Sequence, residues 1–206
     1  GSSSLPTSMI IRLLYFVAVI GGNMANKVDI RIVKSKDSLM SALVSLLQKK
    51  KLEDLSISEV CQEANVNRNT FYSHYTNIRE LFEEMKGQYL ESLLSSSKVF
   101  LESNDSVNRT LLNVLEKMKA KDKLTKVILT EASSTSFLYT LLQILIPQLN
   151  PSENISNLLS DHEYSSFVLG GVANILMLWV STGFKESPKT LSRKLATLIE
   201  ELNNID

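Results

Sequence analysis

The chain has 206 residues, of which 44% are hydrophobic and 21% charged, so it is long enough to bury a substantial core and too apolar for a disordered protein. The formal net charge is zero, so overall charge gives no sign of nucleic-acid binding, and such a function must depend on where the charges are placed. Seven glycines and four prolines favour long helices over a turn-rich β fold, and the single cysteine allows no intrachain disulfide, which favours a cytoplasmic location.

The first part of the chain, residues 1–26, has two interpretations. Residues 13–20 form an apolar run that resembles the core of a signal peptide, but no cleavage site follows it. The sequence Gly-Gly-Asn-Met that ends at Met24 is also compatible with a ribosome-binding site ahead of a start codon, so residues 9–23 are either a translated leader or a native hydrophobic extension. We therefore predict that residues 1–26 are a tag, a leader or a disordered extension.

Apolar residues recur every three or four positions over residues 34–50 and predict a first helix. Ser56 followed by Glu59 is a capping-box pattern, which predicts that a short second helix begins there. Asn67 is a suitable N-cap for a third helix over residues 68–75, and a repeated cap pattern after it predicts a long fourth helix. Two short helices joined by a brief turn are the arrangement of a helix-turn-helix motif.

The middle of the chain predicts further helices. Apolar stripes mark one helix around residues 107–118 and another around residues 137–145, which Pro147 and Pro151 should end. No strand-like alternation of any length is present. We therefore predict an all-α fold of about nine helices.

The last two predicted helices are the most apolar part of the chain. The first covers residues 161–184, and its apolar run at residues 167–180 is shorter than the ~20 residues that a membrane-spanning helix needs, so we predict no membrane segment. Ser187, followed by a proline, is a typical helix start and predicts the last helix over residues 188–204.

Residues 55–81, LSISEVCQEANVNRNTFYSHYTNIREL, resemble the DNA-binding motif of the TetR/AcrR family of transcriptional regulators. They agree in length and at most positions with the family's pattern of a capped helix, a turn, the sequence R-x-T-F-Y-x-x-Y/F and a following capped helix. With the first helix included, the resemblance covers residues 34–90. It implies a three-helix helix-turn-helix domain at residues 27–80, followed at residues 81–206 by a helical domain for ligand binding and dimerisation.

A recognition helix exposes polar and aromatic side chains near its N-terminus to base edges and phosphates. Arg68 can pair bidentately with guanine and Asn69 with adenine, and the free backbone N–H groups of this first turn favour a phosphate. Ser56 resembles the family's phosphate-contacting Ser or Thr, whereas the spacing of Phe71 and Tyr75 predicts that both face inward. We predict that DNA is contacted by Ser56, Asn67, Arg68, Asn69, Thr70, Tyr72, Ser73, His74 and Arg79.

Two features near the motif leave questions open. Ile78 stands where the family commonly has a lysine that holds a phosphate; the adjacent Arg79 can substitute for it only in a different register, which leaves that contact open. Four basic residues lie between positions 27 and 36, and they are either an arm that reaches the DNA backbone or minor groove or an ordinary solvated leader.

One helix-turn-helix unit binds only a few base pairs weakly, so a two-fold pair of units is expected. The helices at residues 161–184 and 188–204 carry more apolar surface than one core face needs, and we predict that they form an antiparallel four-helix homodimer interface. The resemblance implies repression at a pseudo-palindromic double-stranded DNA operator, relieved by a small-molecule effector held among residues 81–148. Candidate effector-binding residues in the apolar helix are Asn174, Met177 and Trp179, and their surroundings suit a hydrophobic or amphipathic molecule.

Other functions remain open at this point. The chain is alternatively a ligand-independent DNA-binding co-regulator that acts through a protein partner, an activator, or, if residues 9–23 are native, a membrane-tethered regulator. Met177 and Trp179 also fit a purely structural role in the core or the dimer contact. With two histidines, no cluster of metal-ligand type around His74 and no catalytic or phosphate-loop motif, we predict no enzyme activity, metal or cofactor.

Overall fold

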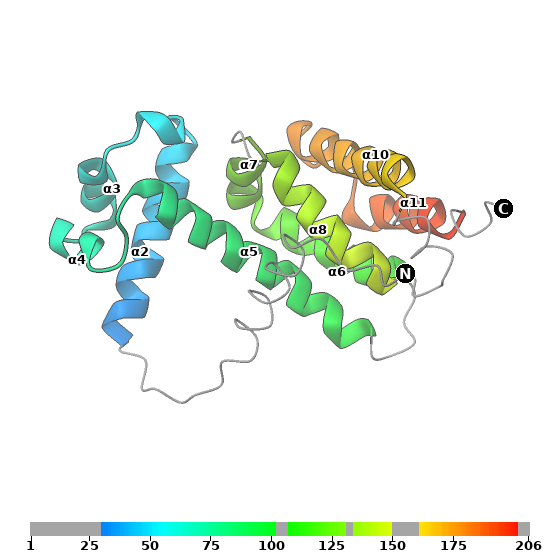
Figure 1. Cartoon of the computed structure of the whole chain (residues 1–206), viewed down its shortest axis with the longest axis horizontal. Coiled ribbons are helices and arrows are strands. Elements are labelled where there is room, and N and C mark those ends of the chain that lie inside the picture. The colour runs from blue at the N-terminus through cyan, green and yellow to red at the C-terminus, as the bar shows by residue number, and fades with distance from the viewer. Residues whose placement is uncertain (1–29, 102–106, 131–133, 150–160, 202–206) are drawn as a thin grey trace, which may run out of the picture. The chain divides into compact units, whose positions relative to one another are not determined.

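The computed structural model describes residues 30–101, 107–130, 134–149 and 161–201, so the predictions for residues 1–26 lie outside the described residues. Contacts divide the chain into two compact units, Gly1–Lys36 and Asp37–Asp206, and the first unit is described only over residues 30–36. Within the described ranges every regular element is helical, with nine α-helices and one short 3₁₀ helix at Leu52–Asp54 (Figure 1). The all-α prediction is therefore confirmed.

Helix α2 spans Ile30–Leu47, beginning four residues before the predicted start. Its inward positions Leu39 and Leu43 are buried, as the apolar spacing predicts. Because the helix already begins at Ile30, the basic residues at positions 31, 34 and 36 belong to a helix rather than to an extended arm, while Lys27 lies outside the described residues.

Helix α3 spans Ile57–Ala64 and begins with the predicted capping box. The Glu59 amide donates to Ser56 Oγ at 3.3 Å, and the Ser56 amide donates to the Glu59 carboxylate at 2.9 Å. The Lys50 ammonium also binds this carboxylate. The hydrogen bond from Lys50 and those from Ser56 lower the pKa of Glu59 to about 2. The cap therefore joins the start of α3 to the residues that follow α2.

Helix α4 spans Arg68–Tyr72 and is shorter than the predicted 68–75. Its predicted N-cap is confirmed, because Asn67 Oδ1 accepts from the Asn69 amide at 2.8 Å. The helix ends early because the next cap already begins at Thr76, whose amide donates to the Glu80 carboxylate at 2.7 Å. The long helix α5, Ile78–Leu101, follows directly, so the orientations of α4 and α5 are linked by a short capped turn.

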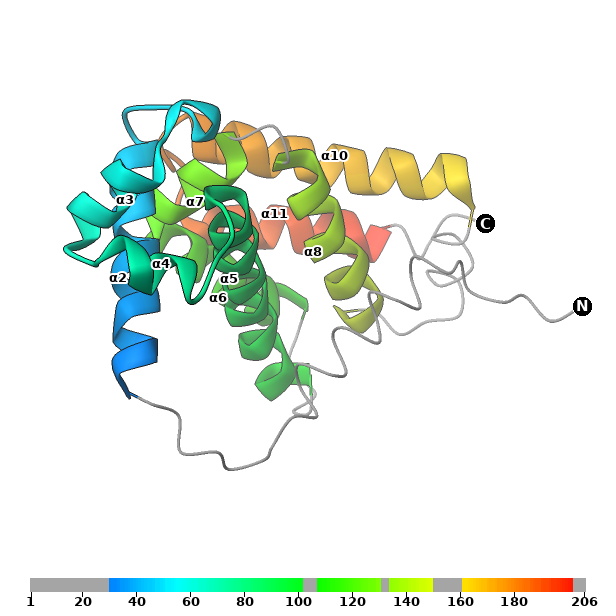
Figure 2. The same ribbon diagram turned by 60° about the vertical axis from the view of Figure 1, so that its left-hand side comes forward.

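The middle of the chain forms α6 (Val107–Ala120), α7 (Asp122–Thr130) and α8 (Ser134–Leu149). Helix α6 lies between α5 and α11, and α8 packs against α5, α7 and α10 (Figure 2). The helix predicted to end at Pro147 and Pro151 continues through Pro147 and ends at Leu149, two residues before Pro151. A proline this close to a helix end removes only one backbone hydrogen bond, which the last turn tolerates.

One polar network lies inside this helical core. The Tyr89 hydroxyl on α5 lies 2.6 Å from Thr125 Oγ1 on α7, and Thr125 in turn donates to the Met118 carbonyl at 2.7 Å. Burial raises the pKa of Tyr89 to about 12, so Tyr89 is neutral and acts as the donor to Thr125. The Tyr89 ring stacks on Phe137 of α8 with a centroid distance of 5.7 Å. Since Met118 lies on α6, four helices, α5 to α8, are joined by one hydrogen-bonded chain and one ring pair.

Helix α10 spans His162–Ser181, and α11 spans Pro188–Glu201 with Ser187 as its N-cap, as predicted. Helix α10 packs against α7 and α8. It is longer than its apolar run, and by length and composition alone it could cross a membrane, although 39% of its most apolar stretch is buried inside the protein. Helices that form the core of a protein share this composition.

Candidate nucleic-acid interface

Helices α3 and α4 are held in a helix-turn-helix arrangement by a turn and a buried aromatic pair. Asn65 adopts a left-handed conformation with φ 52°, and the Val66 amide donates to the Cys61 carbonyl at 2.9 Å, which closes α3 and redirects the chain. Phe71 and Tyr75 are almost fully buried, with ring centroids 5.7 Å apart, as their spacing predicts. These two rings hold α4 in place on the side opposite its exposed residues.

The opposite side of α4 is exposed. Asn67, Arg68 and Asn69 are exposed at its N-terminal turn, where the interface residues are predicted. Tyr72 is 52% exposed, although its ring contacts the edge of Phe71 at a centroid distance of 5.8 Å. The pair of rings orients Tyr72 so that its hydroxyl end remains available to a partner.

The other predicted contact residues differ in how free their polar atoms are. Thr70 and His74 are half-buried, and the exposed Ser73 donates its hydroxyl hydrogen to the Thr70 carbonyl at 2.7 Å. Ser56 is exposed at the start of α3, but its hydroxyl donates to the Glu59 carboxylate at 2.7 Å. A phosphate at Ser56 would have to compete with this carboxylate, so Ser56 is a weaker candidate than its position suggests.

The position of the family's lysine is occupied here by a buried apolar residue. Ile78 is 8% exposed and forms part of the core at the start of α5. A lysine at that position would bring its charge toward a buried environment unless it extended to the surface. Arg79 is exposed at the next position and offers a cation on the outer side of the same turn.

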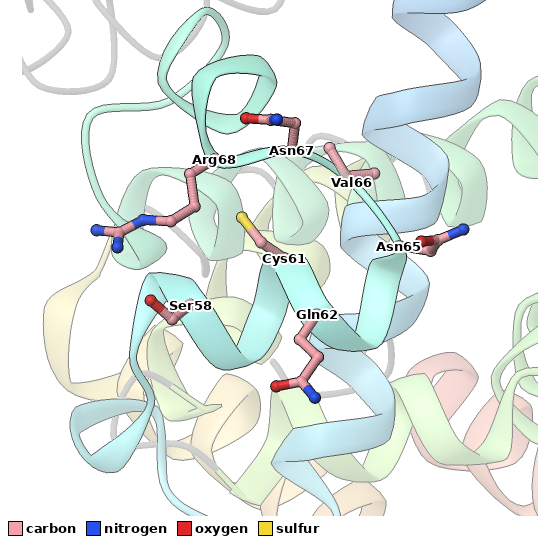
Figure 3. A pocket seen from close by; sticks show the side chains of 7 residues that line it. All are labelled: Ser58, Cys61, Gln62, Asn65, Val66, Asn67 and Arg68. Carbon is pink, nitrogen blue, oxygen red and sulfur yellow. The ribbon is translucent and has the colours of Figure 1, made fainter.

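An open hollow of about 460 Å³ lies between α3 and the start of α4 (Figure 3). Sequence reasoning identified two of its lining residues, Asn67 and Arg68, but missed Ser58 and Gln62, which are exposed on α3. Their spacing of four residues places both on one helix face, a signal that was present in the sequence. The hollow is lined by Ser58, Cys61, Gln62, Asn65, Val66, Asn67 and Arg68.

Cys61 lies at the floor of this hollow with its sulfur directed toward the start of α4 (Figure 3). The residue is 4% exposed, and burial raises the pKa of its thiol while the charge of Arg68 opposes that shift. Cys61 is therefore a neutral thiol that packs as a small apolar side chain.

The three residues predicted to bind an effector differ in exposure, and that role stays a prediction. Asn174 is exposed, Met177 is half-buried and Trp179 is buried, so they point to different sides of α10. The Trp179 indole N–H donates to the Glu186 carbonyl at 2.8 Å, which gives this side chain a structural role. Among the residues in the four described ranges, no group of three or more His, Cys, Asp or Glu side chains is placed to hold a metal ion.

Trp179 also belongs to the motif that ends α10. The Phe184 amide donates to the Trp179 carbonyl at 2.9 Å and the Gly183 amide donates to the Val180 carbonyl at 3.0 Å, which is the bonding pattern of a Schellman motif. Gly183 has φ 75°, the left-handed conformation that this motif requires. The rings of Trp179 and Phe184 meet edge to face at 4.7 Å and cover the end of the helix.

A capped helix, a tight turn and a short second helix with an exposed first turn define a protein of the helix-turn-helix class. Residues 35–85 match the family described as bacterial regulatory proteins of the tetR family, and residues 105–201 match the family described as a transcriptional regulator C-terminal region. The chain belongs to the TetR family of transcriptional regulators, and it is not an enzyme.

A curated relative and several solved structures are similar to this chain. The chain is 33% identical over 60 residues to an uncharacterized HTH-type transcriptional regulator, YxbF, of Bacillus subtilis (strain 168). That match spans 29% of this chain but only 16% of the length of YxbF.

Three solved structures share the fold. The fatty acid degradation regulator FadR of Bacillus halodurans has a TM-score of 0.61 at 14% identity, with 80% of this chain and 94% of FadR covered. The dihydroxyacetone kinase operon activator DhaS has a TM-score of 0.59 at 17% identity, with coverages of 84% and 98%. A TetR transcriptional regulator of Streptococcus agalactiae 2603V also has a TM-score of 0.59, at 20% identity, with coverages of 82% and 95%.

Proposed function

We propose that this protein is a cytoplasmic, homodimeric repressor that binds a pseudo-palindromic double-stranded DNA operator and is released by a small-molecule effector. Residues 27–80 form its DNA-binding domain and residues 81–206 its regulatory and dimerisation domain. The observation that carries this proposal is the exposed N-terminal turn of α4, which buried Phe71 and Tyr75 support from the opposite side. A rigid, short helix with free polar side chains at its leading end suits the major groove.

The contacts divide into those that read bases and those that position the protein on the duplex. Arg68 and Asn69 are exposed and carry the donor and acceptor groups that pair with guanine and adenine edges, and the exposed ring of Tyr72 suits a thymine methyl or a phosphate. The remaining residues position the protein on the sugar-phosphate backbone, and these are Ser56, Asn67, Thr70, Ser73, His74 and Arg79.

Release by an effector is supported by the connection between α4 and the body of the protein. Helix α5 begins at the capped turn directly after α4 and then packs against α6 and α8. A molecule bound among α5–α8 therefore acts on a helix that is joined to the recognition element. Such a ligand must bind the two conformations unequally in order to shift them, and the apolar side chains of these helices favour a hydrophobic or amphipathic molecule.

The proposal is tested by isolating genomic DNA fragments bound to the protein and measuring the affinity of variants for the recovered operator. We expect Arg68→Ala to weaken binding about 5- to 100-fold, the value of one bidentate base contact, and Tyr72→Phe to weaken it less. Arg109→Ala, which changes an exposed arginine on α6, is the matched control and should bind normally. Unchanged affinity in both Arg68→Ala and Tyr72→Phe would exclude α4 as the recognition helix.

A further inference from the structure

Helix α10 has an exposed side that carries no charge. Phe167, Gly171, Asn174 and Leu178 are exposed, and their spacing of four, three and four residues places them on one face. Phe167 is 79% exposed and Leu178 61% exposed, and the whole stretch from residue 165 to 182 contains no charged side chain. We call these four residues the α10 stripe. The solvent-facing side of a surface helix is ordinarily polar and charged, so the α10 stripe has the composition of a covered surface.

The two adjacent glycines of α10 have different surroundings. A Cβ atom at Gly170 would lie 2.9 Å from the Tyr139 hydroxyl oxygen, so the packing of α8 on α10 explains why this position has no side chain. A Cβ atom at Gly171 would meet nothing within 4 Å. Glycine destabilises a helix interior relative to alanine, and packing against the described residues does not explain it at Gly171. Close approach of another backbone to the α10 stripe does explain it.

Asn174 lies in the middle of the α10 stripe. Its amide makes no hydrogen bond to any residue in the described part of the chain, and its neighbours along the stripe are Gly171 and Leu178. An amide both donates and accepts hydrogen bonds, so two copies of the same residue can pair across a two-fold axis. A charged residue at such a position would face its own charge and repel it. The stripe is therefore complementary to itself.

The distribution of charges along α11 also favours a second copy of this chain as the partner. Lys189 and Arg193 lie in its first half and Glu201 at its end, the opposite of what the dipole of the helix favours. Two antiparallel copies of α11 would place the basic half of one beside the acidic end of the other. Leu198 is 45% exposed on this helix and adds apolar surface. Charge complementarity thus favours a second copy of this chain over an unrelated partner.

We propose that the α10 stripe is a close contact between two copies of this chain, in which Gly171 permits the helices to approach and paired Asn174 amides set their register. The inference rests on the proposed homodimer and adds which residues define its geometry. A single amide in an apolar helix contact fixes register and oligomeric state, while it weakens the association relative to an apolar residue.

The role of Gly171 is tested by sedimentation equilibrium with a matched glycine. Gly171→Ala should raise the dimer dissociation constant roughly tenfold or more, because a methyl group at a close contact forces the helices apart. Gly87→Ala is the control, since Gly87 lies in α5 with no atom within 4 Å of an added Cβ. It should leave the dissociation constant unchanged while making the helix more stable. Equal dissociation constants for wild type and Gly171→Ala would refute the close approach.

The role of Asn174 is tested with two substitutions of similar size. Asn174→Asp should raise the dissociation constant roughly tenfold or more at pH 8, because two carboxylates then face each other, while the helical content is preserved. Asn174→Leu should associate at least as tightly as wild type but form species larger than a dimer. If the wild type is a dimer and both variants keep its dissociation constant and oligomeric state, this inference is refuted while the proposed homodimer stands. A monomeric wild type at micromolar concentration would refute the proposed homodimer as well.

Discussion

Truncating Trp179 tests whether the end of α10 depends on the packing that the structure assigns to it. The indole is 4% exposed, its N–H donates to the Glu186 carbonyl, and its ring meets Phe184 at 4.7 Å. Trp179→Ala removes all three interactions. Trp179→Phe keeps an aromatic ring against Phe184 and removes the N–H donor, so the two variants separate ring packing from hydrogen bonding.

The magnitude follows from the burial. Replacing a buried Trp with Ala lowers the free energy of unfolding by about 3–5 kcal/mol, which includes the cavity that remains. The lost hydrogen bond leaves the Glu186 carbonyl without this donor and accounts for about 1 kcal/mol of the total. We expect Trp179→Phe to lower the free energy of unfolding by about 1–2 kcal/mol, since it loses that bond and some volume. A domain of this kind is stable by about 5–15 kcal/mol, so the Ala variant should be visibly weakened.

The assay is urea unfolding followed by far-UV circular dichroism at a fixed protein concentration. Trp179 is the only tryptophan, so its fluorescence cannot report on variants that lack it. The concentration is fixed because a dimer's apparent stability depends on it. If Trp179→Ala unfolds at the same urea concentration as wild type, the side chain does not hold the end of α10, and an effector-binding role for it regains support.

Four further substitutions test three local features of the fold. The pKa of Glu59 is lowered from 4.5 to about 2, so its contribution to stability is present above pH 4.5 and is lost as the pH falls toward 2. The difference in unfolding free energy between wild type and Glu59→Gln should therefore vanish as the pH falls from 4.5 to about 2. Gly183→Ala should lower the free energy of unfolding by about 1–2 kcal/mol in thermal melts, because φ 75° strains any residue with a Cβ atom. Thr125→Val should destabilise the protein by about 1–3 kcal/mol in urea, more than Tyr89→Phe at about 0.5–1.5 kcal/mol, because only the first leaves a buried hydroxyl without an acceptor. The reverse order would show that the Tyr89 hydroxyl reaches another acceptor.

The starts of helices with a side-chain cap were predictable because their signals are local, whereas α2, whose start was predicted from apolar spacing, begins four residues earlier than predicted. The capping box of Ser56 and Glu59, the N-cap Asn67 and the N-cap Ser187 all form as predicted, since each needs only residues within one turn. The end of α4 was predicted three residues too late. The end of this helix depends on the next cap, which begins at Thr76. Periodicity alone does not show to which of two adjacent helices the residues between them belong.

The candidate interface was partly predictable for a related reason. Asn67, Arg68 and Asn69 were identified because they belong to one short segment with a known role in helix-turn-helix proteins. Ser58 and Gln62 were missed because they lie on α3, and they join the same hollow only when α3 and α4 pack together. The prediction of Ser56 as a phosphate contact came from its resemblance to the family's Ser or Thr, and in the folded protein its hydroxyl hydrogen goes to the Glu59 carboxylate.

The apolar helix α10 shows a different limit of sequence reasoning. When a helix is apolar on nearly every side, a period of 3.6 residues has no polar face to locate, so Asn174 and Trp179 look equally suited to a cavity. In the structure the two residues separate: Trp179 is buried against Phe184, and Asn174 is exposed with Gly171. Which side of α10 stays exposed depends on which of its faces the other helices of the chain cover, and that is a property of tertiary packing. The proposed contact between two copies therefore depends on which side of α10 is left uncovered as well as on the composition of that side.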